Sequence, residues 1–169
     1  MKKFELTDET IIHNGRILHR IKALKNFGDI QSGKLGGYVE KEDNLSQSGD
    51  AWLYDDAKVY DDAKVYGNAI VSGNAEVNGN TKVNGNAKVN GNAMVSGNAD
   101  YTTIKGFETK YRDTTFFRTK DNKICVVCGC FSGTIEEFRK QVKRTRSGKI
   151  AKEYLAIADL MELHFKKIK

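Results

Sequence analysis

The densest group of side chains capable of chemistry is basic and lies in the last third of the chain. Seven cations fall within a short stretch: Arg139, Lys140, Lys143, Arg144, Arg146, Lys149 and Lys152, with Lys166, Lys167 and Lys169 following at the tail. Acids occur only at the flanks, as Glu136, Glu137 and Glu153. Such a cluster repels itself unless an anion is present, which favours a phosphate, nucleotide or nucleic-acid ligand. A solvated face that only keeps the protein soluble remains the alternative.

Histidine, cysteine and aspartate offer other chemistry. Three histidines, His13, His19 and His164, could act as general bases, but all lie outside the repeat described below, so we expect surface or half-buried side chains.

The thiols of Cys125, Cys128 and Cys130 could bind zinc. A structural zinc site needs four ligands and no other cysteine exists, so we favour buried small side chains and predict no metal and no cofactor. Asp55, Asp56, Asp61 and Asp62 could bind calcium, but aspartate also suits a turn with positive φ, which we favour.

Composition limits the class of protein. The chain has 169 residues and a net charge of +6, with a pI of about 9.1, and the positive excess lies in residues 101–169. No apolar run is long enough to cross a membrane, and the N-terminus has no secretory h-region. Clustered cysteines do not make a disulfide framework, so we expect a reduced, cytoplasmic protein with no membrane partner.

An aliphatic residue recurs every six positions through residues 51–100. The series is Leu53, Val59, Val65, Val71, Val77, Val83, Val89 and Val95. A small residue follows each one four places later, and Gly-Asn lies between them in most units. Neither a helix nor a strand has this period, so it indicates a solenoid in which each unit is buried by stacking on its neighbours.

The repeat resembles the hexapeptide repeat of left-handed parallel β-helix proteins. In that family three six-residue units, or hexads, form one triangular turn, so residues 18 apart stack in columns. The outward Lys58 would then lie beside Glu76 in a surface ion pair, and Lys64 beside Lys82. The resemblance implies homo-oligomers, specifically trimers. Many such proteins are acetyltransferases with a histidine base, but the repeat here has no histidine and no inserted loop, which argues against acyl transfer.

The flanks of the repeat carry their own signals. In residues 1–50, Asn14-Gly15 between apolar pairs predicts a β-hairpin with Ile12 opposite Ile17, and the spacing of Val39, Leu45 and Leu53 predicts a first turn with a two-residue insertion. In residues 101–169 we expect two strands, at 114–119 and 123–131, with Cys128 and Cys130 on one face and Cys125 on the other.

Two helices should follow these strands. Thr134 and Glu137 form a capping box for the first, which presents Ile135, Phe138 and Val142 on one face, and Ser147-Gly148 ends it. The second begins near Lys149 and carries a stripe that packs as core. The stripe is Tyr154, Ile157, Ala158, Met161, Phe165 and Ile168.

The whole chain also resembles a group of small phage and prophage proteins. The shared segments include Leu35-Gly36-Gly37-Tyr38-Val39 before the hexads and Cys128-Gly129-Cys130-Phe131-Ser132-Gly133-Thr134 after them. This resemblance implies a mobile-element origin and a location in the host cytoplasm, and it implies no particular reaction.

These observations predict a mainly β protein: a left-handed parallel β-helix of about three or more turns, an N-terminal hairpin and a basic α+β C-terminal module. We expect a non-enzymatic, oligomeric phage or prophage accessory protein. It would bind an anionic ligand, a host protein, a nucleotide or a nucleic acid through the basic cluster, as an anti-defence inhibitor of the anti-CRISPR type or as a sponge for nucleotide signals. The alternatives are a hexapeptide-repeat acyltransferase and a purely structural assembly protein.

Overall fold

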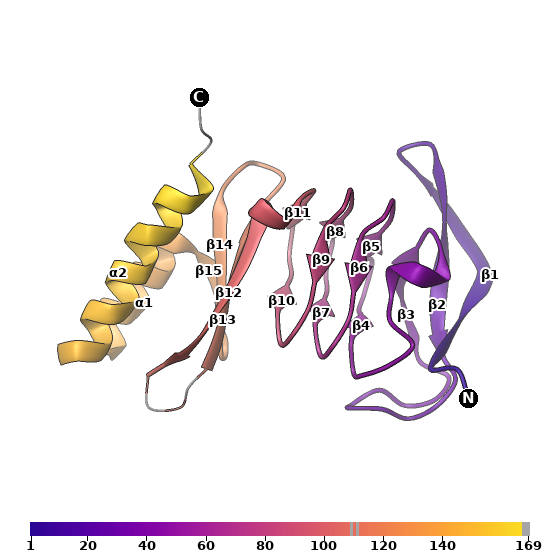
Figure 1. Ribbon diagram of the computed structural model, residues 1–169, viewed down its shortest axis with the longest axis horizontal. Coiled ribbons are helices and arrows are strands. Elements are labelled where there is room, and N and C mark those ends of the chain that lie inside the picture. The colour runs from indigo at the N-terminus through magenta and orange to yellow at the C-terminus, as the bar shows by residue number, and fades with distance from the viewer. Residues whose placement is uncertain (109, 111, 167–169) are drawn as a thin grey trace.

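The structure is a computed structural model that describes residues 1–108, 110 and 112–166. It is mainly β and is built around a solenoid of about three turns (Figure 1). An N-terminal hairpin closes one end of the solenoid, and an antiparallel sheet backed by two helices closes the other. No described helix is long and apolar enough to cross a lipid bilayer. The left-handed winding and the trimer stay predictions.

The hairpin forms as its turn sequence predicts. Strands β1 (Phe4–His13) and β2 (Arg16–Ala23) pair antiparallel, with Ile12 opposite Ile17. Asn14 and Gly15 both have positive φ, which is the geometry that an Asn-Gly turn supplies. Strand β3 (Leu35–Val39) pairs with β2 on one side and with the solenoid strand β5 on the other, so the hairpin extends one wall of the solenoid.

Each hexad of the solenoid contributes a two-residue strand. These are β4 (Trp52–Leu53), β5 (Lys58–Val59), β6 (Lys64–Val65), β7 (Ile70–Val71), β8 (Glu76–Val77), β9 (Lys82–Val83), β10 (Lys88–Val89) and β11 (Met94–Val95). They pair in parallel in three stacks, β4–β7–β10, β5–β8–β11 and β6–β9. All eight aliphatic residues of the repeat have no exposed surface, so the stacking of residues 18 apart is confirmed.

The first turn is also confirmed. Val39 pairs with Val59, and Leu45 forms a bridge to Val65, while a short 3-10 helix (Glu42–Asn44) lies between them. Leu53 pairs with Val71, which completes the turn. The two-residue insertion therefore lies between Leu45 and Leu53, at a corner where no strand pairing is lost.

The acidic residues Asp55 and Asp61 lie at corners of the solenoid. Gly73 and Gly79 have positive φ, and Asp55 and Asp61 adopt the same conformation one turn earlier. The carboxylate of Asp55 accepts a hydrogen bond from the Gly73 N–H at 3.1 Å, and that of Asp61 accepts one from Gly79 at 3.2 Å. These aspartates thus stabilise the corner of the next turn, as the turn interpretation predicts.

The C-terminal sheet has four strands, where the sequence analysis expected two. They are β12 (Tyr101–Phe107), β13 (Arg112–Arg118), β14 (Ile124–Cys128) and β15 (Phe131–Thr134), and they follow a 3-10 helix at Asn98–Asp100. The expected strand at 123–131 is wrong because Gly129, with a φ of 61°, turns the chain after Cys128. Strand β12 begins with Tyr101-Thr102-Thr103-Ile104, residue types that favour strands, so a signal for it was available in the sequence.

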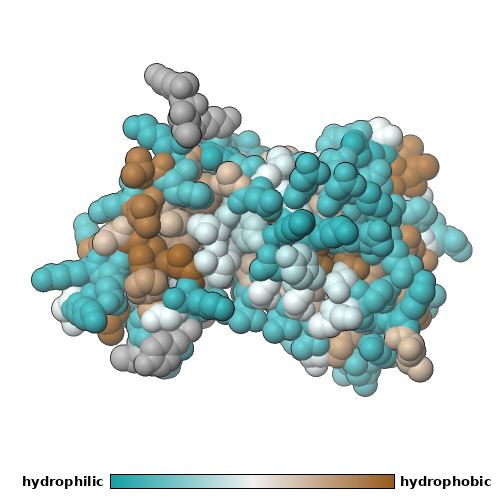
Figure 2. All heavy atoms as spheres, in the orientation of Figure 1, coloured by the Kyte–Doolittle hydropathy of each residue, from teal (hydrophilic) through white to brown (hydrophobic). Residues whose placement is uncertain are grey.

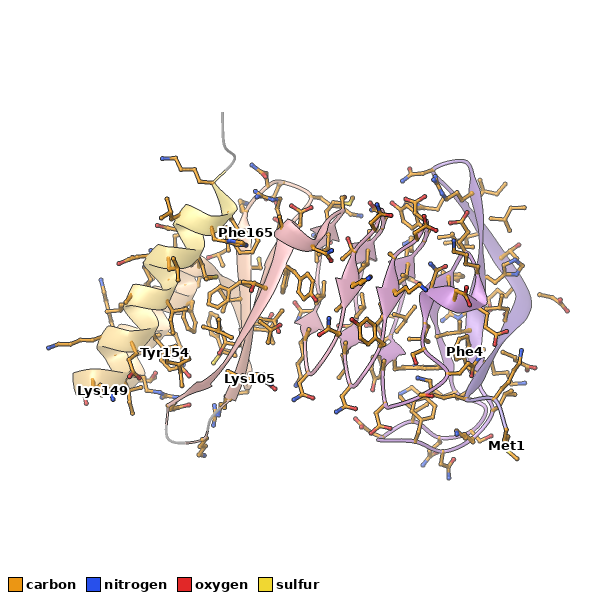
Figure 3. The ribbon with its side chains drawn as sticks, viewed as in Figure 1. Met1, Phe4, Lys105, Lys149, Tyr154 and Phe165 are labelled. Atoms are coloured by element: carbon orange, nitrogen blue, oxygen red, sulfur yellow. The ribbon has the colours of Figure 1, made fainter. Side chains whose placement is uncertain are left out.

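Two helices cover the outer face of this sheet. The capping box at α1 (Ile135–Thr145) is confirmed, since Thr134 and Glu137 exchange hydrogen bonds, and α2 spans Gly148–Phe165. Tyr154 and Phe165 are buried between α2 and the sheet, whereas Lys149 extends into solvent (Figure 3). Ile168, Lys167 and Lys169 lie outside the described residues.

Candidate functional site

A buried carboxylate lies at the centre of the solenoid wall that β5, β8 and β11 form. The Glu76 side chain, on β8, is only 4% exposed. Its Oε2 accepts hydrogen bonds from His13 Nε2 at 3.0 Å and from the Tyr60 hydroxyl at 3.2 Å. Its Oε1 accepts one from Lys120 Nζ at 2.6 Å. A carboxylate so deeply buried is stable only with partners of this kind, and all three are in place.

Residues far apart in sequence meet at this carboxylate. His13 ends β1 at the tip of the N-terminal hairpin, and Lys120 lies in the turn between β13 and β14. The hairpin tip and that turn lie along the same edge of the molecule in Figure 1. Tyr60 stacks edge-on against the His13 ring with centroids 5.5 Å apart. The solenoid therefore provides a rigid base, and the two end modules supply the basic groups.

Charge balance keeps Glu76 ionised. Burial alone would raise its pKa, but the hydrogen bonds and charges of Lys120 and His13 outweigh burial, so the pKa of Glu76 lies below its ordinary value. Burial raises the pKa of the Tyr60 hydroxyl, which stays a neutral donor. In the tautomer that carries its proton on Nε2, His13 donates to Glu76, and Nδ1 is then the ring nitrogen that can accept a proton.

This site was not predicted from the sequence. Lys58 does lie beside Glu76 in register, but its ammonium donates to the Asp56 carbonyl at 2.9 Å, so the expected Lys58–Glu76 ion pair is wrong. His13 is half-buried, as expected for the histidines, but the hairpin folds it back onto the wall of the repeat, which the sequence did not indicate. One signal was available: Glu76 is the only acid at the position just before the repeated aliphatic residue.

The other two histidines lie elsewhere. His19 is half-buried on β2, with Nδ1 3.3 Å from the Thr7 carbonyl oxygen. His164 is exposed at the end of α2 and stacks on Phe165. His13 differs from both: its side chain is 22% exposed, and its ring contacts a buried carboxylate.

Part of the predicted basic cluster is neutralised inside the molecule. Arg139 binds Asp159 at 2.7 Å and Glu162 at 2.5 Å, both from α2, and Arg146 binds Glu108 at 2.6 Å. Lys149 pairs with Glu153 at 3.6 Å. Only Glu136, Glu137 and Glu153 flank the cluster in the sequence, but the fold brings further acids to it from α2 and from the loop after β12.

The remaining cations of the cluster face solvent. Lys140, Lys143, Arg144 and Lys152 are exposed and make no ion pair with the described residues. Lys140 and Arg144 line an open hollow of about 360 Å³ together with Phe131, Ser132, Glu137 and Gln141. Four of the seven predicted residues thus have no ion-pair partner among the described residues, and binding by the cluster stays a prediction.

The three cysteines do not gather. Cys125 packs towards the solenoid and Cys128 towards the helices, as alternation along β14 predicts. Cys130 lies in the turn after β14 and is exposed, so its expected strand position is wrong. Within the described residues, no three His, Cys, Asp or Glu side chains are arranged to hold a metal ion.

Comparison with known proteins gives a limited similarity. No family model matches the chain. Over 63 residues, the chain is 30% identical to a protein of Escherichia coli (strain K12) described as the uncharacterized acetyltransferase YdcK. The matched region is 32% of this chain and 19% of that protein, so the chain spans only a fraction of its relative's length. The similarity is therefore a distant one, to an acetyltransferase, in a chain that folds as a β-solenoid.

Proposed function

We propose that the protein catalyses acyl transfer from a thioester donor such as acetyl-CoA, with His13 as the general base. One observation carries the proposal: the hairpin holds His13 on the solenoid wall, 3.0 Å from the buried carboxylate of Glu76. A histidine oriented by a carboxylate is a common arrangement for activating a nucleophile. The distant similarity to an acetyltransferase supports the same reaction class.

The reaction follows from these groups. An amine or hydroxyl of the acceptor attacks the thioester carbonyl, forming the new C–N or C–O bond, while Nδ1 of His13 takes the proton that the acceptor loses. The C–S bond then breaks, and the proton passes to the leaving thiolate. Glu76 holds the His13 ring through Nε2 and stabilises the positive charge that forms on it. Lys120 and Tyr60 keep Glu76 in place, so they are positioning residues.

The experiment measures consumption of acetyl-CoA by chromatography, with a mixture of amino sugars, amino acids and nucleosides as acceptors. We expect protein-dependent consumption that falls by about 100-fold or more in His13→Ala, which is the usual contribution of a general base. His19→Ala is the matched control because His19 lies on the same hairpin without contacting Glu76. Absence of consumption by the unmodified protein, or full activity of a folded His13→Ala variant, would contradict the proposal.

Binding of an anionic ligand is the second candidate. The exposed cations Lys140, Lys143, Arg144 and Lys152 support it, because no acid of the described chain pairs with them. The phage or prophage origin, the anti-defence role and the non-enzymatic, oligomeric character expected above belong with this candidate and stay predictions.

The test of this candidate uses labelled ATP and a short DNA duplex as probes at low and high salt. We expect affinity that falls with salt and falls by about 10-fold or more in the Lys143→Glu plus Arg144→Glu variant. Lys105→Glu plus Lys123→Glu, on another part of the module, removes the same charge and is the control. Equal binding by both double variants would exclude this surface.

A further inference from the structure

A polar groove lies at the waist of the molecule, away from His13 and from the cations of α1. It has a volume of about 440 Å³ and forms where β12 leaves the last turn beside β9. Figure 2 shows this waist between the solenoid and the C-terminal module. Its lining residues are Tyr66, Lys82, Asn84, Asn98, Tyr101, Thr102 and Thr103. Clefts at the junction of two modules are common places for small-molecule sites, and this volume suits a small ligand.

Hydrogen bonds within the groove fix its two amides. The Asn84 amide donates to the Tyr66 hydroxyl at 3.1 Å, and the Lys82 backbone N–H donates to Asn98 Oδ1 at 2.9 Å. The Tyr101 hydroxyl donates to the Lys82 carbonyl. These bonds leave Asn84 Oδ1 as an acceptor and the Asn98 amide N–H groups as donors, so the groove presents both kinds of group at fixed positions.

Aromatic surface and a single cation complete the groove. Tyr66 is 39% exposed, which leaves part of its ring available to a ligand. The Lys82 side chain is exposed and makes no ion pair with the described residues, and none of the seven lining residues is acidic. A polyanion would meet only one positive charge here, and an apolar ligand would leave the amides and hydroxyls without partners.

We propose that this groove binds an acidic sugar, a hydroxyl-rich molecule with one carboxylate. Its hydroxyls would exchange hydrogen bonds with Asn84, Asn98, Thr102 and Thr103, and the apolar face of the ring would pack on Tyr66. Lys82 would bind the carboxylate. The site is independent of acyl transfer, because none of its lining residues contacts His13 or Glu76.

The experiment is an NMR titration of the isotopically labelled protein with glucuronate, glucose and inorganic phosphate. We expect glucuronate to shift the amide signals of Asn84, Asn98 and Thr102, and to bind at least 10-fold more tightly than glucose or phosphate. Lys82→Ala and Asn84→Ala should each weaken glucuronate binding by about 10-fold. Lys64→Ala is the matched control, because Lys64 pairs with Lys82 in register one turn below but does not line the groove.

Other outcomes would overturn the proposal. Equal binding of glucose would show that the carboxylate is not recognised. Equal binding of phosphate would show a simple anion site at Lys82. Shifts that remain in both Lys82→Ala and Asn84→Ala, or no shifts with any probe, would show that the groove does not bind this class of ligand.

Discussion

Lys120 Nζ lies 2.6 Å from Glu76 Oε1, in a contact that joins the C-terminal module to the middle of the solenoid. The opposite oxygen of the same carboxylate contacts His13 of the N-terminal hairpin. One glutamate thus connects two modules that are otherwise separated by the length of the solenoid. The contact serves the fold whether or not His13 takes part in catalysis, so it can be tested through stability alone.

We expect Lys120→Met to destabilise the protein by about 2–4 kcal/mol, because it leaves a buried carboxylate with less compensating charge. The loss should appear in the free energy of unfolding measured with urea. Lys123→Met is the control, since Lys123 pairs with Asp121 where both side chains are mostly exposed, and it should cost less than about 1 kcal/mol. Equal losses in the two variants would show that the contact with Glu76 stabilises the protein no more than an exposed ion pair does.

Glu76 also predicts a pH dependence. Its pKa is lowered in the folded protein, so its ionised form stabilises the fold above the ordinary pKa of 4.5, and this contribution is lost as pH falls through the lower folded pKa. We therefore expect the free energy of unfolding to decrease in acid more steeply for the unmodified protein than for Glu76→Gln. Parallel pH profiles of the two proteins would contradict this assignment.

The burial of Lys3 predicts that the free energy of unfolding depends on pH in the alkaline range. Its ammonium is buried, donates to the Ala51 carbonyl at 2.8 Å and has a pKa lowered by burial from 10.5 to about 8. Between these values the unfolded chain holds a proton that the folded chain has lost, so the free energy of unfolding should rise with pH there. Lys3→Met should remove this rise. Urea titrations across the range, compared between the two proteins, provide the measurement.

Gly37 on β3 is required for close packing against the first turn. A Cβ at this position would overlap the Ala57 carbonyl oxygen and lie 3.0 Å from Leu53 Cβ. We expect Gly37→Ala to cost about 1–3 kcal/mol or more, measured as a lower urea midpoint. Gly97→Ala is the control, because its Cβ would meet no atom within 4 Å and its φ is −161°, so its midpoint should change little.

Arg139 should act in the fold and not in ligand binding. It connects α1 to α2 through Asp159 and Glu162, whose side chains are 74% and 46% exposed. We expect Arg139→Ala to lower stability by about 1 kcal/mol and to leave ATP binding unchanged. If the anionic-ligand candidate is correct, Lys140→Ala should instead weaken ATP binding and leave the stability unchanged. Thermal unfolding and the binding titration together distinguish the two residues.

Local patterns predicted most of the fold. The six-residue repeat placed residues 18 apart, such as Val59 and Val77, in one column. Asn14-Gly15 defined the hairpin register, and Thr134 with Glu137 defined the start of α1. Each of these signals depends on neighbours in the chain or on an exact period. Strand β12 was missed although its Tyr, Thr, Ile and Phe residues favour strands.

The candidate site could not be predicted in the same way. His13 and Glu76 are 63 residues apart, and their contact depends on the hairpin folding back along the wall, which no local pattern encodes. The same reason explains Arg139, whose partners lie on a second helix that packs against the first. In both cases the charge of each residue was evident, but its partner was set by tertiary packing.

The shared contact at Glu76 also depends on the number of turns in the solenoid. Duplicating one 18-residue turn would move the end modules apart by about 4.8 Å, the spacing of paired strands. His13 and Lys120 could then no longer reach the same carboxylate. Repeat number in this protein is therefore tied to a single glutamate, and insertion or deletion of whole turns should be tolerated only together with a change at that residue.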